Sequence, residues 1–376
     1  MTSTVGLLGA YGGVGRAAAR RLASSRIGRL RVGGRRPGLA QDLLDEVCGG
    51  DGESVHVDIA DADSLARFCA GCDVVANCAG PSYRILDAVA RAAHAAGASY
   101  IDAAGDDPVY DLLLASDGRD PAWVGVLSAG MLPGLSGVLP RYLVGLGFDR
   151  VGSLTVFAGG RDFFTPGGAS DYLASLGNGF GESLAAWCGG AKLSRALTPL
   201  RDVELPFFPG PVTAHPYMST ETERLAAALG LQDLSWYNVF EGGHVVRSLG
   251  RLQGAMMGES DLDAAARQLA RAARLDMFGR TPYQLFVLQL DGERDGLPMT
   301  RSLVLRASGA NDLTGAVAAL AVEAVARGDI PPGVHYASDV LDPGATVDAL
   351  QHMDAVEVLE VLDGPVDNAP VEEGVL

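Results

Sequence analysis

Three glycines spaced three residues apart, Gly9, Gly12 and Gly15, carry the clearest chemical signal in the sequence. An apolar run typical of a strand ends at Gly9, and a helix-forming run begins at Arg16. Because glycine has no Cβ, the backbone of such a turn can approach a pyrophosphate closely. The N–H groups that open the following helix attract phosphate charge. The pattern predicts a dinucleotide site, the alternative being a tight turn without a ligand; the expected contacts are Gly9, Tyr11, Gly12, Gly13, Val14 and Gly15.

Two arginines, Arg35 and Arg36, follow the second predicted strand, residues 30–33. In a dinucleotide-binding sheet this strand end meets the adenosine ribose, where an acidic residue is typical of NAD. No acidic residue stands there, and a guanidinium can bind a 2′-phosphate through two hydrogen bonds. The sequence therefore predicts NADP(H) as the cofactor; two solvated loop arginines are the alternative. Asp58, at the end of the third predicted strand, is expected near the adenine.

Polar residues also follow the fourth and fifth predicted strands. Asn77, Gly80 and Pro81 come at the end of the apolar run 74–76, where a parallel strand meets the ligand crevice. Tyr83 comes next, and its phenol could protonate or hydrogen-bond a substrate nitrogen or oxygen; packing on a domain seam is the alternative. Asp102, at the end of the fifth strand, could bind a substrate amine or instead cap its own loop.

Two histidines in the second half of the chain, His215 and His244, are further candidates for a general acid, since imidazole titrates near neutrality. A lone histidine is more often a structural residue, which is the alternative for each of them. Arg161 and Arg247 could hold a substrate carboxylate or form surface ion pairs. The histidines do not have the spacing of a metal site, so we expect no catalytic metal.

Composition limits the class of protein. The 376 residues are 48% hydrophobic and 20% charged, enough for two domains with sizeable cores. A formal net charge of −17 argues against binding to nucleic acid or to an anionic membrane. Five cysteines are typical of a reduced compartment, and the C-x-x-C of Cys69 and Cys72 is best interpreted as buried thiols. The most apolar helix candidate, 313–326, is too short to span a bilayer, so we expect a soluble cytoplasmic protein.

Strands alternate with helices through the first 130 residues or so, which predicts a doubly wound parallel sheet. From Pro133 the rhythm changes to strands at 153–158, 244–249, 284–290 and 299–306, which predicts an inserted α+β domain on a mixed or antiparallel sheet. A helix over 313–327 is expected to pack back on the first domain. The predicted division is 1–132 for dinucleotide binding, 133–308 for substrate and dimer contact, 309–345 for the returning segment and 346–376 for an acidic tail.

Five stretches of the chain, residues 9–16, 33–35, 74–81, 97–106 and 129–136, resemble the saccharopine dehydrogenase-like superfamily. The resemblance is specific over roughly the first 140 residues and looser beyond them. It implies a Rossmann domain and NAD(P)H-dependent hydride transfer, most often to or from a carbon–nitrogen bond. It also implies a homodimer that contacts its partner through the second domain.

These observations together predict an NADPH-dependent reductase of a C=N (imine) bond in a small biosynthetic metabolite. One alternative is an enoyl or carbonyl reductase that acts on a carrier-bound or lipid-like substrate. Another is a non-catalytic NADP-binding protein. The expected partners are a small-molecule substrate and a second copy of the chain, without nucleic acid or membrane.

Overall fold

The computed structural model describes residues 3–116, 122–176, 180–252 and 259–368, and these divide into two compact units. Unit 1 contains residues 1–138 and 310–346, and unit 2 contains residues 139–309 and 347–376. Unit 1 is thus built from two separate stretches of chain, with most of unit 2 inserted between them.

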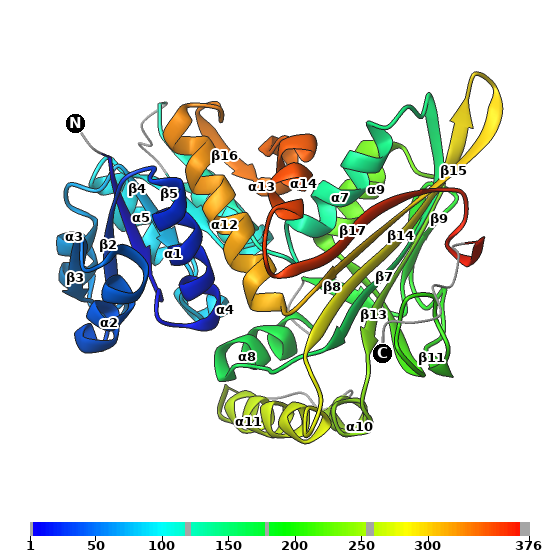
Figure 1. Ribbon diagram of the computed structural model, residues 1–376, viewed down its shortest axis with the longest axis horizontal. Coiled ribbons are helices and arrows are strands. Elements are labelled where there is room, and N and C mark those ends of the chain that lie inside the picture. The colour runs from blue at the N-terminus through cyan, green and yellow to red at the C-terminus, as the bar shows by residue number, and fades with distance from the viewer. Residues whose placement is uncertain (1–2, 117–121, 177–179, 253–258, 369–376) are drawn as a thin grey trace. The chain divides into compact units, whose positions relative to one another are not determined.

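Unit 1 is organised on a seven-stranded sheet whose order is β16-β6-β5-β4-β1-β2-β3 (Figure 1). Every pairing in it is parallel, and the chain crosses outward from β1 in both directions. This confirms the predicted doubly wound Rossmann sheet. Its strands are β1 (Thr4–Leu8), β2 (Arg29–Gly34), β3 (Gly52–His56), β4 (Val74–Asn77), β5 (Ser99–Asp102), β6 (Val124–Leu127) and β16 (Gly333–Tyr336).

Helices connect these strands and cover the sheet. α12 (Ala310–Arg327) returns after the insertion and lies beside α1 (Gly13–Ser25) in Figure 1. A Cβ on Gly315 would lie 2.5 Å from the carbonyl oxygen of Val14, so glycine is what allows the two helices to approach this closely. The others are α2 (Pro37–Cys48), α3 (Ala62–Cys69), α4 (Ser82–Ile85), α5 (Ala88–Ala95), α6 (Asp107–Ala115) and α13 (Ala337–Val340), while α7 (Leu135–Val144) and α14 (Pro343–Gln351) cross the division between units.

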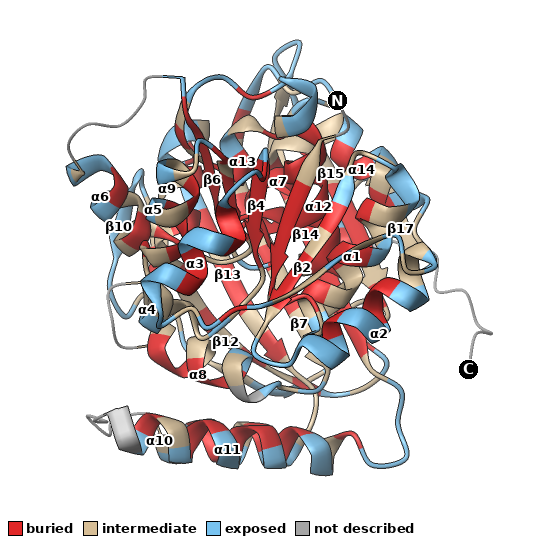
Figure 2. Ribbon diagram, turned by 90° about the vertical axis from the view of Figure 1, so that its left-hand side faces the viewer, coloured by how far each residue is buried: buried red, intermediate tan, exposed pale blue. Residues whose placement is uncertain are grey.

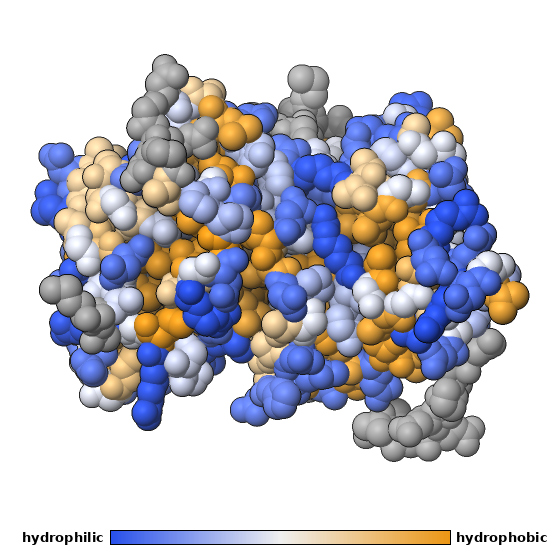
Figure 3. Space-filling view, turned by 90° about the horizontal axis from the view of Figure 1, so that it is seen from above, coloured by the Kyte–Doolittle hydropathy of each residue, from blue (hydrophilic) through white to orange (hydrophobic). Residues whose placement is uncertain are grey.

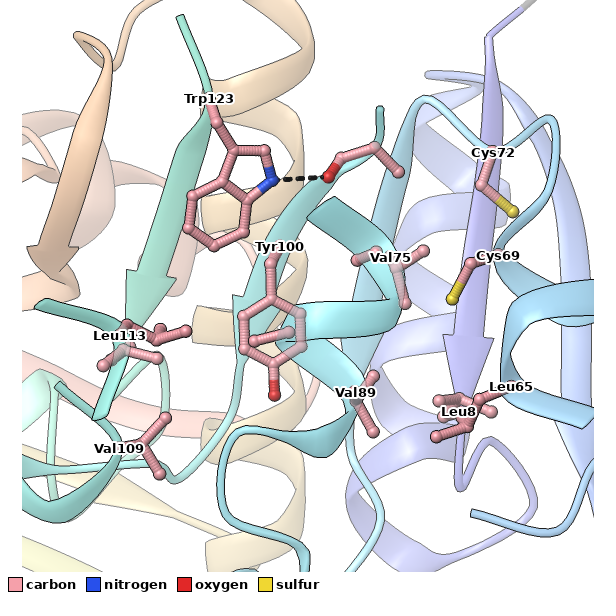
Figure 4. Packing of buried hydrophobic residues seen from close by; sticks show 14 of the residues in the cluster. Leu8, Leu65, Cys69, Cys72, Val75, Val89, Tyr100, Val109, Leu113 and Trp123 are labelled. Atoms are coloured by element: carbon pink, nitrogen blue, oxygen red, sulfur yellow. Dashed lines mark hydrogen bonds between the residues drawn. The ribbon is translucent and has the colours of Figure 1, made fainter. Parts of the chain in front are cut away.

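A large cluster of buried apolar side chains lies on the side of the unit 1 sheet that α3 and α5 cover. Figure 4 shows the ring of Tyr100 at the centre of this cluster, with Trp123 at one end. The Trp123 indole N–H donates to the carbonyl oxygen of Ala98 at 2.7 Å, so its one polar group is satisfied. Cys69 and Cys72 are buried free thiols, and burial raises the pKa of Cys69 to about 12, which makes the thiol unreactive.

Unit 2 is built on a ten-stranded mixed sheet. β13 pairs with β7 in parallel, and the other pairings are antiparallel. The strands are β7 (Arg150–Arg161), β8 (Gly181–Ser183), β9 (Ala186–Cys188), β10 (Ala191–Leu193), β11 (Leu200–Val203), β12 (Val212–Ser219), β13 (Asp233–Phe240), β14 (Tyr283–Arg294), β15 (Leu297–Ala307) and β17 (Val356–Asp363). The helices are α8 (Pro166–Ser175), α9 (Thr220–Leu229), α10 (Gly243–Leu252) and α11 (Glu259–Asp276), followed by the 3₁₀ turn η1 (Val366–Asn368).

Two sequence-based assignments in this unit are wrong. Residues 244–249 form part of helix α10 instead of a strand, because buried Val245, Ser248 and Leu249 recur at helical spacing and the Asp276 carboxylate accepts from the first N–H groups of the helix. Residues 356–363, assigned to an acidic tail, form β17 and pair with β15. Apolar residues between the acidic ones pack on the sheet there; the end of the tail, 369–376, lies outside the described residues.

Candidate functional site

The glycine turn joins β1 to α1. Gly9 has φ of +70°, and a Cβ there would lie 2.7 Å from the backbone of Cys78 and Ala79. A Cβ on Gly15 would lie 2.4 Å from the Gly9 carbonyl oxygen, so α1 can start this close to the turn only with glycine. α1 has no acidic residue in its first turn, and Gly12 and Gly13 are exposed. The backbone N–H groups that begin α1 are therefore accessible to an anion, as a pyrophosphate requires.

The end of β2 brings positive charge to the same turn. Arg35 and Arg36 are exposed, and neither forms an ion pair with any described residue. The Arg36 guanidinium lies 5.3 Å from the centroid of the Tyr11 ring, so a residue of the glycine turn contacts the arginine loop. By contrast, Arg16 and Arg20 on α1 are both paired with Glu46. Arg35 and Arg36 are thus free to bind a phosphate.

Asp58 follows β3 and is exposed. Its carboxylate accepts from the backbone N–H of Ala60 at 3.0 Å, which fixes the turn before α3. This contact leaves further acceptor capacity on a carboxylate. The placement is compatible with the predicted adenine contact.

The ends of β4 and β5 are joined by buried side chains. Asn77 and Asp102 are directly paired in the parallel register, and Asn77 donates to the Asp102 carboxylate at 3.3 Å. The Tyr100 hydroxyl donates to the same carboxylate oxygen at 2.5 Å. Asp102 also accepts from the N–H of Ala104, and the Asn77 oxygen accepts from the N–H of Ala79. The network therefore holds both loops that leave the sheet at this edge.

Burial dominates the electrostatics of this network. It raises the pKa of Asp102 above its ordinary value, although the bonds from Tyr100, Ala104 and Asn77 act in the opposite direction. Burial also raises the pKa of Cys78 to about 12, and the nearby Asp102 charge adds to the shift. Both carboxylate oxygens of Asp102 accept hydrogen bonds from groups inside the protein, so Asp102 orders the loop that follows β5. This arrangement favours the alternative that the carboxylate caps its own loop.

Replacing Asp102 by alanine should lower the free energy of unfolding by about 2–4 kcal/mol, because the Tyr100 hydroxyl and the Asn77 amide would lose a buried acceptor. Asp102→Asn keeps an acceptor oxygen and removes a charge that burial disfavours, so its loss should be clearly smaller. Urea unfolding followed by circular dichroism measures both. Equal losses for the two variants would contradict this role of the carboxylate.

The loop after β4 contains the remaining predicted residues of unit 1. Gly80 is exposed, Pro81 is half-buried, and Pro81 precedes the short helix α4, on which Tyr83 lies. The guanidinium of Arg84 lies 5.3 Å from the centroid of the Tyr83 ring. Tyr83 therefore lies in the first turn of α4, after the loop that leaves the carboxyl end of β4, and this is the edge of the sheet at which nicotinamide binds in this fold.

The predicted residues of unit 2 lie on different elements. His215 is on β12, where its ring contacts Phe240 edge-on with centroids 6.1 Å apart. Its Nε2 is buried without a hydrogen-bond partner, and burial lowers its pKa, with the charge of Arg201 as a second cause. His244 is exposed in the first turn of α10. Arg161 pairs with Glu241 and both are 11% exposed, which favours a structural ion pair over a carboxylate site.

The lowered pKa of His215 predicts a pH dependence of stability. The unfolded chain binds this proton more readily than the folded one, so stability falls as pH drops below the ordinary histidine pKa of about 6.5. The His215→Asn variant should lose less stability between neutral and mildly acidic pH than the parent protein does. Urea midpoints measured over that range test this, and parallel curves for the two proteins would contradict it.

Two further residues lie near the site although the sequence does not predict them as part of it. The Tyr100 hydroxyl belongs to the Asp102 network, although the sequence indicates only a strand tyrosine. The Asn311 side chain lies against Gly13, so that a Cβ on that glycine would be 2.7 Å from Asn311 Cγ. Asn311 comes from α12, about 300 positions away, and its sequence signal is only that of a helix cap.

Two kinds of feature are absent from the described part of the chain. No group of three or more His, Cys, Asp or Glu side chains is arranged to hold a metal ion. No helix among the same residues is both long and apolar enough to cross a membrane.

Comparison with known proteins finds likenesses to a domain family and to solved structures. Residues 5–116 match the family model of the saccharopine dehydrogenase NADP binding domain. No curated protein matches the chain. Among solved structures, apo saccharopine dehydrogenase (L-Glu forming) from Saccharomyces cerevisiae is similar to 96% of this chain and 100% of its own, with a TM-score of 0.67 and 16% identity. A short-chain dehydrogenase/reductase from Veillonella parvula in complex with NADP is similar over 27% of this chain and 47% of its own, with a TM-score of 0.24 and 15% identity.

The family model confirms the predicted superfamily for unit 1 and NADP(H) as its cofactor. It also supports the predicted class, an NAD(P)-dependent oxidoreductase. The likeness to the yeast structure confirms the predicted fold, a Rossmann sheet with a second mixed-sheet unit.

Proposed function

We propose that this chain, whose residues 5–116 match the saccharopine dehydrogenase NADP binding domain, is an NADPH-dependent reductase of a C=N bond in a small biosynthetic metabolite. The observation that carries the proposal is a pair of exposed arginines, Arg35 and Arg36, that form no ion pair with a described residue and lie beside a glycine turn that leaves helix N–H groups open. The choice of a C=N bond follows the superfamily. We expect the active form to be a cytoplasmic homodimer.

The residues fit this cofactor because they supply one site for its pyrophosphate and a separate site for its 2′-phosphate. The turn from Gly9 to Gly15 and the start of α1 would hold the pyrophosphate. Arg35 and Arg36 would bind the 2′-phosphate, with Tyr11 holding the Arg36 side chain in place. When bound, NADPH supplies a hydride from C4 of its nicotinamide.

The chain's own residues then have to orient the substrate and supply one proton. The hydride adds to the carbon of the C=N bond, and a proton must reach the nitrogen to give the amine. We assign that proton to the Tyr83 hydroxyl, because α4 follows the loop after β4 and nicotinamide binds at the carboxyl ends of the strands in this fold. His215 in unit 2 stays the other candidate for a general acid, and its buried Nε2 has no hydrogen-bond partner among the described residues.

A substrate panel separates this function from its alternatives. Purified protein and NADPH are mixed with cyclic imines, with 2-oxo acid and amine pairs, with enoyl thioesters and with simple ketones, and loss of NADPH absorbance is followed. Turnover of the imines or of the oxo acid and amine pairs is the expected result. Turnover of thioesters or ketones alone would favour the alternative reductase. Tight NADPH binding without turnover of any class would favour a non-catalytic NADP-binding protein.

A further inference from the structure

Helices α10 and α11 carry a group of arginines that have no acidic partner. Arg247 and Arg251 on α10, and Arg267, Arg271 and Arg274 on α11, are exposed. None of the five forms an ion pair with another described residue, and all belong to a chain with 46 acidic residues. Arginines elsewhere are commonly paired, as in Arg21 with Glu323, Arg31 with Glu53 and Arg306 with Glu357. Some arginines of unit 1 also form no ion pair with a described residue, namely Arg35 and Arg36 at the proposed phosphate site and Arg26 and Arg67 elsewhere.

The α11 arginines lie on one side of the helix. Arg267, Arg271 and Arg274 follow each other at i, i+4 and i+7, so they span about 10 Å along a single face. Figure 2 shows the exposed side of α11 directed away from the rest of unit 2. The opposite side is apolar and buried, with Leu269 and Ala273 among its residues. α11 is therefore held in place by its apolar side, and its arginine side is free of internal contacts that need the charge.

Two large apolar side chains continue this face at the end of the helix. Leu275 is 52% exposed and Phe278 is 89% exposed. We call Arg267, Arg271, Arg274, Leu275 and Phe278 the α11 face. Apolar surface alone would not distinguish it, because orange apolar surface lies between blue polar side chains in several places on the view of Figure 3. The combination of unpaired arginines with an exposed aromatic residue is typical of protein interfaces.

Among the arginines of the α11 face, only Arg274 is placed to support its own helix, since it lies in the last turn and its Nε donates to the carbonyl oxygen of Ala270 at 3.4 Å. Like charges at i, i+4 and at i, i+3 on a helix repel each other, so the arrangement weakens α11 in isolation. Arg247 and Arg251 repeat the i, i+4 arrangement on α10, which packs against α11. Asp276, the acidic residue at the end of α11, is already engaged by the N–H groups of His244 and Val245. The positive charge is thus left for a group outside the chain.

We propose that the α11 face docks an acidic surface of a second protein. The spacing of the arginines matches a partner helix with carboxylates at i, i+4 and i+7, and Leu275 and Phe278 would add apolar contact at one end. A membrane is a poorer occupant, because interfacial helices insert an apolar side into the lipid and that side of α11 is buried within unit 2. Nucleic acid is opposed by the net charge of −17.

The test uses a fluorescein-labelled helical peptide with glutamates at i, i+4 and i+7 and a leucine beyond them. Its binding to the full chain is measured by anisotropy at low salt. The variant R267E/R271E/R274E should bind it at least about tenfold more weakly, because attraction becomes repulsion. The matched control is R67E/R195E/R294E, which changes the net charge equally at exposed arginines elsewhere and should stay within about twofold of the parent.

Several outcomes would overturn the proposal. These are no binding of the peptide, equal weakening in both triple variants, or no loss in the α11 variant. Vesicles of phosphatidylcholine with about 30% phosphatidylserine form a separate arm. Sedimentation with these vesicles that depends on the α11 face, without peptide binding, would assign the face to lipid. NADPH binding should be unchanged in both variants, so this test and that of the proposed function fail independently.

Discussion

Replacing Arg35 and Arg36 together by alanine should raise the Kd of NADPH by about 100-fold. Both guanidinium groups are exposed beside the glycine turn and have no ion pair within the described residues, so their charge is available to the 2′-phosphate. NADH lacks that phosphate, and its Kd should stay within about threefold of the parent value. Fluorescence titration of each nucleotide measures the effect.

The matched control for this experiment is Arg67→Ala. Arg67 is exposed in the last turn of α3 in the same unit and is not one of the predicted nucleotide contacts, so the Kd of NADPH should be unchanged. The single variants Arg35→Ala and Arg36→Ala divide the effect between the two side chains. Equal changes for NADPH and NADH in the double variant would defeat the assignment of the phosphate to these arginines.

Changing Tyr83 to phenylalanine should lower kcat for the imine substrate by about 100-fold or more, because the hydroxyl is the proposed proton donor. The ring that contacts Arg84 would remain, so α4 should keep its place and the Kd of NADPH should not change. The measurement is steady-state kinetics across pH, with NADPH titration on the same preparations.

Tyr110→Phe serves as the control, since Tyr110 is a half-buried tyrosine of unit 1 whose ring stacks on Tyr336 at 4.7 Å. It should leave kcat within about twofold of the parent, as substitutions outside a reaction centre usually do. A Tyr83→Phe enzyme as active as this control would remove Tyr83 from the reaction and leave His215 as the next candidate.

Much of unit 1 could be predicted because its signals are local. The glycine turn, the apolar runs and the arginines after β2 each lie within a few residues of one another, and parallel topology then fixes which strand ends meet. β16 and Asn311 could not be found this way. They come from chain that returns after the insertion, and nothing near them in the sequence indicates which sheet or turn they join.

Two other features could not be predicted from the sequence because they depend on contacts between residues that are distant along the chain. Asp102 is predicted either as a substrate group or as a loop cap, and only the register that pairs it with Asn77 decides which groups its carboxylate meets. Residues 244–249 contain the β-branched pair Val245 and Val246, which favours a strand, yet the cap from Asp276, which lies 32 positions beyond His244, belongs to a helix. Both outcomes depend on residues brought together by folding.

Isothermal titration calorimetry of the purified chain with NADPH, NADP⁺, NADH and NAD⁺ tests the central claim most directly. We predict saturable heat with NADPH and NADP⁺ at one site per chain, and binding at least about tenfold weaker for the two nucleotides without the 2′-phosphate. Absence of heat with all four nucleotides would contradict nucleotide binding by unit 1, and the proposed hydride transfer would be wrong as well.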